Sequence, residues 1–374
     1  MTLKFQGSPT PSVGVEMEFQ LVDRDRRELV SLAPRLLSEF RGESWIKPEL
    51  LESTIEINTD VCANVGDARQ DLRAKIDRVR EAVAGHGAAL VSAGTHPFSK
   101  WTDQRVTADD RYHRLVDRMQ WPAKRLVIFG LHVHVGVPDG ETAIQVVNHL
   151  ERWVPHLLSV TASSPFWEGR DTGLASSRTK IFEALPTAGL PYRHQSWRDF
   201  EQLQDALIRA GAIQSAREIW WDVRPHPRFG TVEVRVCDAV PTLDETIAVA
   251  AWIQALIVHL QRAVAESVAA EPLHNRIVRE NKWRAARWST AGSTIVDGEG
   301  AVEPIGVSIG KLLGKLRPVF RELGSEGELP RLQEMIVRAP SYARQRAMFQ
   351  DTGDLRDVVD GLIREGEEDR PIYV

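Results

Sequence analysis

Two short stretches, far apart in the chain, place charged side chains inside an alternating apolar strand pattern. In residues 14–21 (GVEMEFQL) apolar residues recur at every second position, so Glu16 and Glu18 must emerge together on the other face. In residues 231–238 (TVEVRVCD) the valines form the packing face, and Glu233 and Arg235 share the opposite one. Carboxylates held close together on a sheet repel one another unless a cation or a shared proton neutralises them. The pattern therefore predicts a divalent-metal site.

A third acidic segment covers residues 48–58 (PELLESTIEIN). We expect one strand here, with Glu52 and Glu56 on the same face. Glu49 has the other parity and joins them only if a bulge shifts the register. Taken alone, an E-x-E pattern is common on the solvated face of an edge strand, so these acids gain meaning only together with the other segments.

The stretch 126–137 is expected to form a strand that carries His132 and His134 on one face. A single histidine in an apolar strand is usually a hydrogen-bonded core residue. Two alternating histidines beside acidic strands fit a ligand role better. His134 could line a phosphate pocket or simply pack.

The candidate ligands are mostly carboxylates with one or two imidazoles, which favours Mg²⁺ or Mn²⁺ over structural zinc. Five or six carboxylates are more than one such ion would use, so two or three ions are expected. Phosphoryl transfer is the reaction that most often needs several metal ions around a triphosphate. The sequence contains neither a G-x-G-x-x-G nor a Walker A motif, so a nucleotide would be bound in another way.

Composition indicates an ordinary soluble, globular protein with 43% hydrophobic and 26% charged residues. Its formal charge of −5 gives no general attraction for nucleic acid or an anionic membrane. The apolar run 247–260 is expected to be too short to span a bilayer, and the N-terminus lacks a signal-peptide pattern. With only Cys62 and Cys237, a reducing, cytoplasmic location is expected.

Strands are expected before about residue 240 and helices after it, which favours an α+β fold over a doubly wound sheet. We expect a single domain over residues 1–374. Besides the segments above, short strands are expected at 89–93 and 219–223, a turn at 224–228, and a long loop after Ser163. Helices are expected from Asp67 and at 141–162, 197–210, 243–268, 272–288, 307–323 and 329–349.

The order of these motifs resembles the glutamine synthetase superfamily. More closely, the chain resembles the bacterial type 2 glutamate–cysteine ligases, also called carboxylate–amine ligases. Three further stretches carry the narrower resemblance: residues 175–191 (ASSRTKIFEALPTAGLP), 220–242 (WWDVRPHPRFGTVEVRVCDAVPT) and 280–288 (ENKWRAARW). The similarity covers nearly the whole chain.

The resemblance assigns roles to individual residues. Arg235 corresponds to the arginine that faces the transferred phosphate, and Arg178 to an arginine in the substrate-side loop. For one acidic ligand, strand parity favours Glu52, whereas the wider family's spacing favours Glu49. The other implied metal ligands are Glu16, Glu18, Glu56, His132 and Glu233, and the implied nucleotide-binding residues are Asn281, Arg284 and Arg287.

Two positions depart from the family pattern. Met17 stands where relatives commonly have a third acidic residue, but it belongs to the core face, so no ligand is lost. After Trp288 the chain continues with Ser289, Thr290 and Ala291, where relatives often have Gly-Leu and an acidic residue. Local substrate contacts are expected to differ there.

The resemblance implies an ATP-dependent ligase that joins a carboxylate, such as that of glutamate, to an amine, such as that of cysteine, through an acyl phosphate. It also implies a curved, mainly antiparallel sheet with helices packed on one side, and a homodimer. One alternative is a binuclear metal-dependent hydrolase, because H-x-H on a strand also suits amidohydrolases. Another is a catalytically degenerate nucleotide-binding protein.

Overall fold

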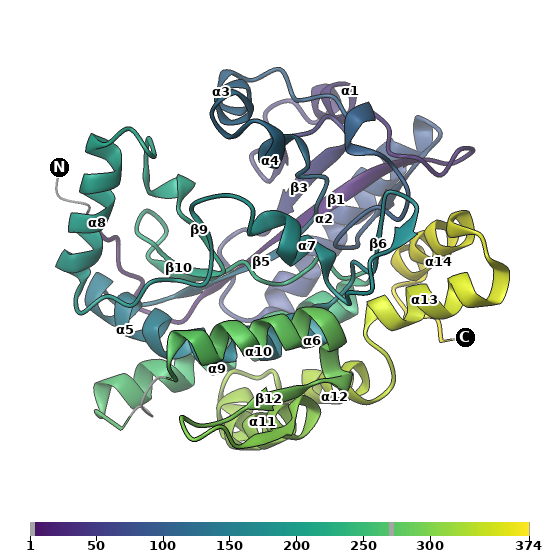
Figure 1. Ribbon diagram of the computed structural model, residues 1–374. Coiled ribbons are helices and arrows are strands. Elements are labelled where there is room, and N and C mark those ends of the chain that lie inside the picture. The colour runs from purple at the N-terminus through teal and green to yellow at the C-terminus, as the bar shows by residue number, and fades with distance from the viewer. Residues whose placement is uncertain (1–3, 269–272, 374) are drawn as a thin grey trace.

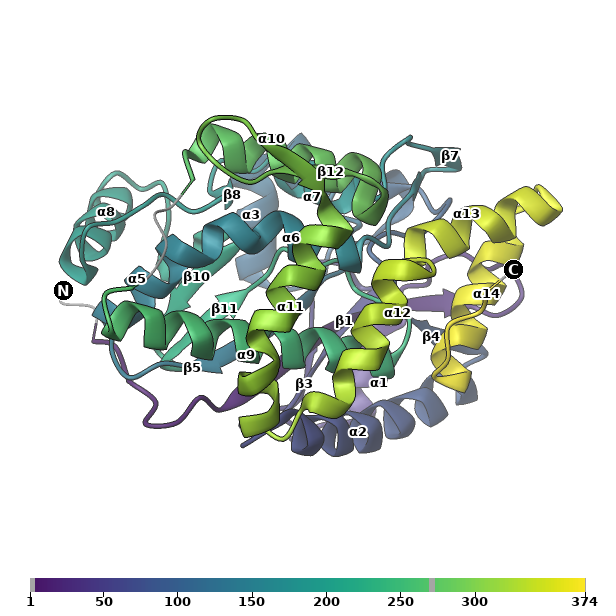
Figure 2. The ribbon, with the colours of Figure 1, turned by 90° about the horizontal axis from the view of Figure 1, so that it is seen from below.

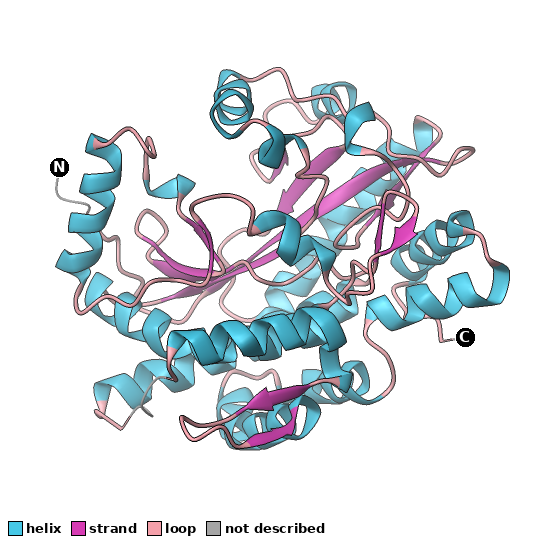
Figure 3. Ribbon diagram, in the orientation of Figure 1, coloured by secondary structure: helices cyan, strands magenta, loops and turns pink. Residues whose placement is uncertain are grey.

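The computed structural model describes residues 4–268 and 273–373. A seven-stranded sheet lies at its centre, with strand order β10-β11-β5-β1-β3-β2 and with β4 on the same edge of β1 as β5 (Figures 1 and 3). Every pairing in this sheet is antiparallel. Its strands are β1 (Val13–Asp23), β2 (Ile46–Pro48), β3 (Thr54–Asn58), β4 (Ala88–Val91), β5 (Leu131–Gly136), β10 (Val223–His226) and β11 (Thr231–Val234).

Strand β1 shows how the sequence pattern sorts the two faces of the sheet. Val15, Met17 and Leu21 are at most 3% exposed and belong to the main hydrophobic core. Glu16 and Glu18 point to the opposite face, as the alternation of side chains requires. The apolar face is therefore committed to packing, and the polar face is left for a site.

Helices α2, α5 and α9 cover the apolar face, and α11 and α12 pack behind α9 (Figure 2). One hydrophobic core runs from Val13 in β1 to Met335 in α12, so the strand-rich and helix-rich parts share it. The helices are α1 (Ala33–Glu39), α2 (Val65–Gly85), α3 (Asp110–Met119), α4 (Trp121–Lys124), α5 (Gly140–Leu150), α6 (Val154–Thr161), α7 (Ser177–Phe182), α8 (Trp197–Arg209), α9 (Leu243–Ala265), α10 (Asn275–Trp288), α11 (Ile305–Glu322), α12 (Leu329–Val337), α13 (Ser341–Thr352) and α14 (Leu355–Glu368).

Helix α9 is the central helix of this layer. With 23 residues it extends the expected apolar run 247–260 at both ends, and the whole helix is long and apolar enough to cross a membrane by length and composition. However, 72% of its most apolar window is buried inside the protein. The hydrophobicity of α9 is thus accounted for by its place in the core.

The predicted α+β class is confirmed, but several predicted strands are shorter than expected; of the segment 231–238, only Thr231–Val234 form strand β11. Within residues 48–58, only Pro48, at the end of β2, and residues 54–58, which form β3, are in strands, because the backbone of Glu52 pairs with Arg105 and Ala33 instead of continuing along the sheet. In the segment 126–137, only isolated bridges precede Leu131, where β5 begins.

Several predicted helices are also divided. The segment 141–162 splits into α5 and α6, and Pro155 lies in the first turn of α6. The segment 329–349 splits into α12 and α13 before Ser341, where Pro340 precedes the new helix. Helix α10 begins at Asn275, and Pro272 lies outside the described residues.

Some elements were not expected from the sequence. Strand β10 includes residues 224–226, which were predicted to be a turn, and α14 had no predicted counterpart. The predicted long loop after Ser163 contains α7 and several two-residue strands. The remaining short strands are β6 (Phe166–Trp167), β7 (Arg170–Asp171), β8 (Ala188–Gly189), β9 (Trp220–Trp221), β12 (Ser293–Ile295) and β13 (Val302–Pro304).

Truncating the core of α9 tests this packing. Leu256 is fully buried, so Leu256→Ala should lower the free energy of unfolding by about 2–5 kcal/mol through lost burial and a residual cavity. Val307→Ala is the control, because Val307 is 49% exposed on α11 and its truncation should change stability by about 0.5 kcal/mol or less. Urea unfolding followed by circular dichroism measures both. Equal losses would contradict the packing described for α9.

Candidate active site

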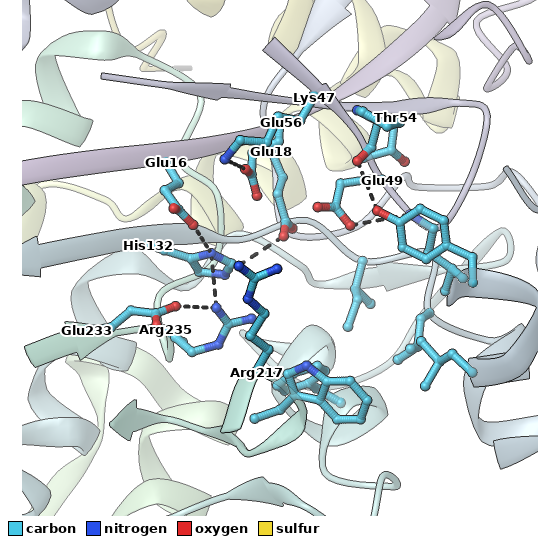
Figure 4. Close-up of a pocket in the computed structure, with 18 of the residues that line it drawn as sticks. Glu16, Glu18, Lys47, Glu49, Thr54, Glu56, His132, Arg217, Glu233 and Arg235 are labelled. Carbon is cyan, nitrogen blue, oxygen red and sulfur yellow. Dashed lines mark hydrogen bonds and ion pairs between the residues drawn. The ribbon is translucent and has the colours of Figure 1, made fainter. Parts of the chain in front are cut away.

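Neighbouring strands bring polar side chains together on the sheet face that α2, α5 and α9 leave open (Figure 4). The antiparallel register sets residues from distant parts of the chain directly opposite one another. The facing pairs are Glu16 with His132, Glu18 with Glu56, and Glu233 with His134. Four segments that the sequence marked separately are thus parts of one site.

These residues line a cavity of about 500 Å³. Its wall combines carboxylates with many cationic side chains, which suits a ligand that carries both metal ions and phosphates. The acidic lining residues are Glu16, Glu18, Glu49, Glu56 and Glu233. The cationic lining residues are Lys47, Arg111, Arg178, Arg217, Arg224, Arg228 and Arg235.

Three overlapping groups of side chains in this cavity could each hold a metal ion. In each group the possible ligand atoms all lie within 4.8 Å of one another. Glu16 and Glu56 each belong to two groups, so neighbouring ions would share ligands. The groups are Glu16, Glu56 and His132; Glu16, His134 and Glu233; and Glu18, Glu49 and Glu56.

Between the two candidates for the remaining acidic ligand, the structure brings Glu49 into the cluster and leaves Glu52 out of it. Glu49 lines the cavity and groups with Glu18 and Glu56. Glu52 lies in the turn before β3 and does not line the cavity. The parity argument for Glu52 is therefore wrong, because β3 begins only at Thr54 and the alternation does not extend back through the turn.

The negative charge of the Glu18, Glu49 and Glu56 group is only partly compensated by neighbouring cations. Burial raises the pKa of Glu49 well above its usual value, and the charges of Glu56 and Glu18 add to this effect. Burial also raises the pKa of Glu56 and of Glu18, with a further contribution from Glu16 in both. Lys47 lies 3.1 Å from Glu56 and offsets only part of the repulsion. A bound cation would relieve it.

Glu16 and Glu233 lie in the opposite electrostatic environment. Burial opposes ionisation of Glu233, but Arg224 and Arg235 outweigh it and hold its pKa well below the usual range. Burial is likewise outweighed at Glu16 by the charge of His134 and by hydrogen bonds to both histidines, so its pKa is lowered too. Both carboxylates are therefore ionised and ready to accept a cation.

The two histidines of β5 are held differently. Burial, reinforced by the charge of Arg235, lowers the pKa of His132 to about 4, so this imidazole is neutral and free to act as a ligand. The His134 Nδ1 atom lies 2.9 Å from the Thr231 hydroxyl. Its Nε2 atom lies 3.4 Å from Glu16 and 3.9 Å from Glu233, and the charges of these two carboxylates outweigh burial and raise the pKa of His134. His134 therefore belongs to a possible ligand group with Glu16 and Glu233, but it binds a metal ion only after Nε2 has lost its proton.

Arg224 and Arg235 both contact Glu233. Arg224 binds it through two hydrogen bonds of 2.7 and 3.3 Å, and Arg235 forms a further ion pair with it. The Arg235 backbone N–H donates to the Asp222 carbonyl, which holds the residue where β11 ends. Sequence reasoning missed Arg224 because two nearby prolines suggested a turn. The signal was present, since a hairpin between β10 and β11 pairs Arg224 with Glu233.

Arg178 reaches the cavity from α7. Its guanidinium donates to the carbonyls of Arg235 and Val236 at 3.3 Å. A Cβ atom on Gly130 would lie 2.3 Å from this guanidinium, so a glycine is needed for the close approach. The Gly130 N–H also donates to Glu18 at 2.5 Å. This part of the site thus depends on a position without a side chain.

Three arginines at the rim escaped the sequence analysis. Arg111, Arg217 and Arg228 line the cavity and are exposed. None has a carboxylate partner within 4.0 Å among the residues that the structure describes. They sit outside any strand alternation that could have marked them. Such cations are available to a phosphate or carboxylate group of a ligand.

Comparison with known proteins adds independent evidence. Residues 12–361 match the model of a family described as "Glutamate-cysteine ligase family 2". The chain is 45% identical over 379 residues to "Putative glutamate–cysteine ligase 2-1" of Frankia casuarinae, covering 100% of this chain and 99% of that protein. It is 43% identical to "Putative glutamate–cysteine ligase 2" of Thermobifida fusca, covering 98% of this chain and 93% of that one.

The chain belongs to glutamate–cysteine ligase family 2. This confirms the predicted family and its class of activity, an ATP-dependent ligase that forms a carbon–nitrogen bond. A solved glutamate–cysteine ligase of Francisella tularensis shares the fold, with a TM-score of 0.70, 12% identity, and coverage of 99% of this chain and 91% of that one. A bifunctional glutathione synthetase of Pasteurella multocida gives a TM-score of 0.67, 14% identity, and coverage of 96% and 52%.

In this ligase, the residues expected to bind nucleotide on α10 do not line the large cavity. The Asn281 side chain is occupied by the backbone of Ile295, with hydrogen bonds of 2.8 and 2.7 Å. Arg284 binds Glu280 on its own helix, and Arg287 packs over Trp288. The nucleotide-binding role of these three residues stays a prediction. In the structure, the Asn281 side chain holds strand β12 in place on α10.

Lys282, the next residue on α10, ties the helix to the active site. Its ammonium group is 1% exposed and lies 2.5 Å from Asp222 and 2.6 Å from Glu183. Asp222 is the residue whose carbonyl holds the backbone of Arg235. In the motif at residues 280–288, the buried Lys282 is thus followed directly by the exposed Trp283. The sequence pattern did not predict this ion pair, because the spacing of apolar residues does not indicate which charged side chains are buried together.

The buried ion pair of Lys282 can be tested against a lysine that shares one partner. Lys282→Met leaves the buried carboxylate of Asp222 uncompensated, so the free energy of unfolding should fall by about 3–5 kcal/mol. Lys180→Met removes a partly exposed partner of Glu183 and should cost about 1 kcal/mol or less. Chemical denaturation measures the two values. Similar losses of unfolding free energy in the two variants would show that the buried ion pair of Lys282 is no more stabilising than the partly exposed one of Lys180.

Proposed function

We propose that this chain transfers the γ-phosphoryl group of ATP to the side-chain carboxylate of glutamate and then joins that acyl group to an amine, with cysteine as the expected acceptor. Balance requires that ATP gives ADP, that the amine nitrogen attacks the acyl carbon, and that phosphate leaves as the amide forms. The names of the relatives support the choice of substrates. The solved Francisella tularensis ligase was crystallised with AMP, which supports a nucleotide substrate.

One observation carries the proposal. Three overlapping ligand groups lie in a single cavity whose wall also carries seven cationic side chains. Carboxylates alone would repel a triphosphate, and arginines alone would not need buried acids beside them. The combination matches a phosphoryl-transfer site, where divalent ions neutralise the charge of the triphosphate.

The residues present fit two or three Mg²⁺ or Mn²⁺ ions. The donors are mainly carboxylate oxygens, which these hard cations prefer. The charge repulsion around Glu49 is a buried feature that a cation would relieve. When bound, the ions would supply electrostatic stabilisation of the phosphates.

The arginines of the chain supply the remaining contacts. Arg235 and Arg224 flank Glu233, and their guanidinium groups can pair with phosphate oxygens in two-point hydrogen bonding. Arg235, at the end of β11, would stabilise the transferring group. Arg178 lies beside Glu18 and is placed to orient the acceptor carboxylate. These roles follow the assignments implied by the family resemblance.

An exposed phenylalanine that stacks on a partly buried histidine lines the cavity where we expect the nucleotide base. Phe229 is 51% exposed and stacks on His226, with ring centroids 4.2 Å apart. Gly230 follows with φ of +66°, and a Cβ there would meet the Gln6 carbonyl at 1.8 Å, so the turn is fixed. A base could stack on this rigid ring, with its phosphates towards Arg224 and Arg235. Trp283 and Trp288, the two exposed tryptophans of α10, do not line the cavity.

The cellular setting belongs to the proposal as well. We infer a cytoplasmic enzyme whose ligands are small molecules, with no nucleic acid or membrane partner, from the overall charge and the two free cysteines. A homodimer is proposed from the family resemblance. Sedimentation of the purified chain measures its oligomeric state directly.

Turnover tests the proposal. ADP release should require glutamate, an amine and Mg²⁺ together, and Glu18→Gln should lower the rate by about 10²-fold or more. The glutamine keeps the acceptor for the Gly130 N–H and removes one charge from a crowded cluster, so the fold should be retained. Glu52→Gln is the matched control and should keep normal activity. Hydrolysis without ATP would favour a hydrolase, and binding without turnover would favour a degenerate nucleotide-binding protein.

Metal binding tests the ligand groups separately from turnover. Glu16 belongs to two ligand groups and Glu49 to one. Glu16→Gln should therefore weaken the binding of two Mn²⁺ ions, and Glu49→Gln the binding of only one. Glu52→Gln should leave binding unchanged. Electron paramagnetic resonance of free Mn²⁺ counts the ions bound to each variant. A loss of binding in Glu52→Gln, with none in Glu49→Gln, would reverse the choice between these two residues.

A further inference from the structure

A second cavity, of about 160 Å³, lies on the other side of α10. It is enclosed by α6, α10, α11 and the β12–β13 hairpin, and none of its lining residues lines the larger cavity. The polar residues that matter for its chemistry are Arg152, His156, Thr294, Glu303, Ser308 and Lys315. Of its lining residues, only Asn281 was given a role by the family resemblance, and the side chain of Asn281 is occupied by the backbone of Ile295.

The wall of the second cavity carries excess positive charge. Arg152 is half-buried, rests on the Trp153 ring at 5.0 Å and reaches only a backbone carbonyl, that of Val296, at 3.4 Å. Neither Arg152 nor Lys315 has a carboxylate within 4.0 Å in the described part of the chain. Lys311 is already paired with Glu303. Two cations are therefore available, which favours an anionic ligand.

Two residues that line the same cavity each have a buried polar atom without a hydrogen-bond partner. His156 is 4% exposed, and its Nδ1 atom makes no hydrogen bond. The hydroxyl of Thr294, which is 1% exposed, makes none either. Leaving such groups unpaired costs about 1–3 kcal/mol each. A bound molecule that pairs with them would recover part of this cost.

The hydrogen bonds around His156 indicate what the ligand must offer. The His156 Nε2 atom lies 2.9 Å from the Ser308 hydroxyl, which itself donates to the Glu303 carboxylate. Since that hydroxyl proton is used, we assign the tautomer in which Nε2–H donates to Ser308. Burial lowers the pKa of His156 to about 3, so the ring is neutral. Its Nδ1 atom is then an acceptor that needs an N–H or O–H donor.

We propose that the second cavity binds a small α-amino or α-hydroxy carboxylate, with the carboxylate at Arg152 and Lys315 and the neighbouring N–H or O–H donated to His156 Nδ1. The volume supports this class, because pockets for drug-sized ligands span about 300–1,000 Å³ and this cavity is smaller. The site is independent of the proposed function, so either can fail without the other.

Three isosteric probes test the requirement for a donor. Lactate and alanine carry a donor beside the carboxylate, whereas propionate carries none. In titration calorimetry of the full chain without nucleotide, lactate and alanine should bind at least tenfold more tightly than propionate. Equal affinity of lactate and propionate, or no binding of any probe, would overturn the proposal.

Variants locate the binding. Arg152→Gln and Lys315→Gln should each weaken lactate binding about tenfold or more, and because Lys315 is exposed its replacement should not disturb folding. Arg276→Gln removes the same charge from an exposed position on α10 that does not line either of these two cavities and should have no effect. Arg178→Gln alters the large cavity. Loss of lactate binding in Arg178→Gln with none in Arg152→Gln would place the probe in the large cavity and refute the second site.

Discussion

Repulsion between carboxylates that the antiparallel register forces side by side is the constraint on which the rest of this structure depends. Glu18 faces Glu56 across two strands, and Glu49 joins them from the preceding turn. In water these groups would move apart, but the strands that carry them are fixed by the packing of their apolar faces on α2 and α9. The core therefore holds together charges that would otherwise separate.

The site resolves this repulsion unequally along its length. At one end, Arg224 and Arg235 neutralise Glu233, so it stays ionised without any ligand. At the other end, burial and neighbouring charges raise the pKa of Glu49. A bound proton or a bound cation must therefore neutralise the carboxylate there. The two ends should consequently differ in their affinity for a cation. Removing charge at Glu233 would leave two arginines without their partner, whereas removing it at Glu18 relieves strain.

Much of this site could be predicted from the sequence because strand alternation ties each side chain to one face. Glu16, Glu18, His132 and Glu233 were predicted from that alternation and meet in one cavity. The same logic failed at Glu52, since the start of β3 depends on backbone pairing with distant segments. Arg224 was missed because its proline neighbours indicated a turn. The family motif on α10 gave the correct helix, but the side chain of Asn281 turned out to hold a hairpin.

Strand β1 carries a consequence for how this protein can change over evolution. It pairs with β3 on one edge and with both β4 and β5 on the other, so its residues cannot shift independently of its neighbours. Inserting or deleting one residue within it would exchange its two faces, sending the acidic groups into the core and the apolar ones into the cavity. A one-residue change in the length of this strand should therefore disrupt the core and the site together.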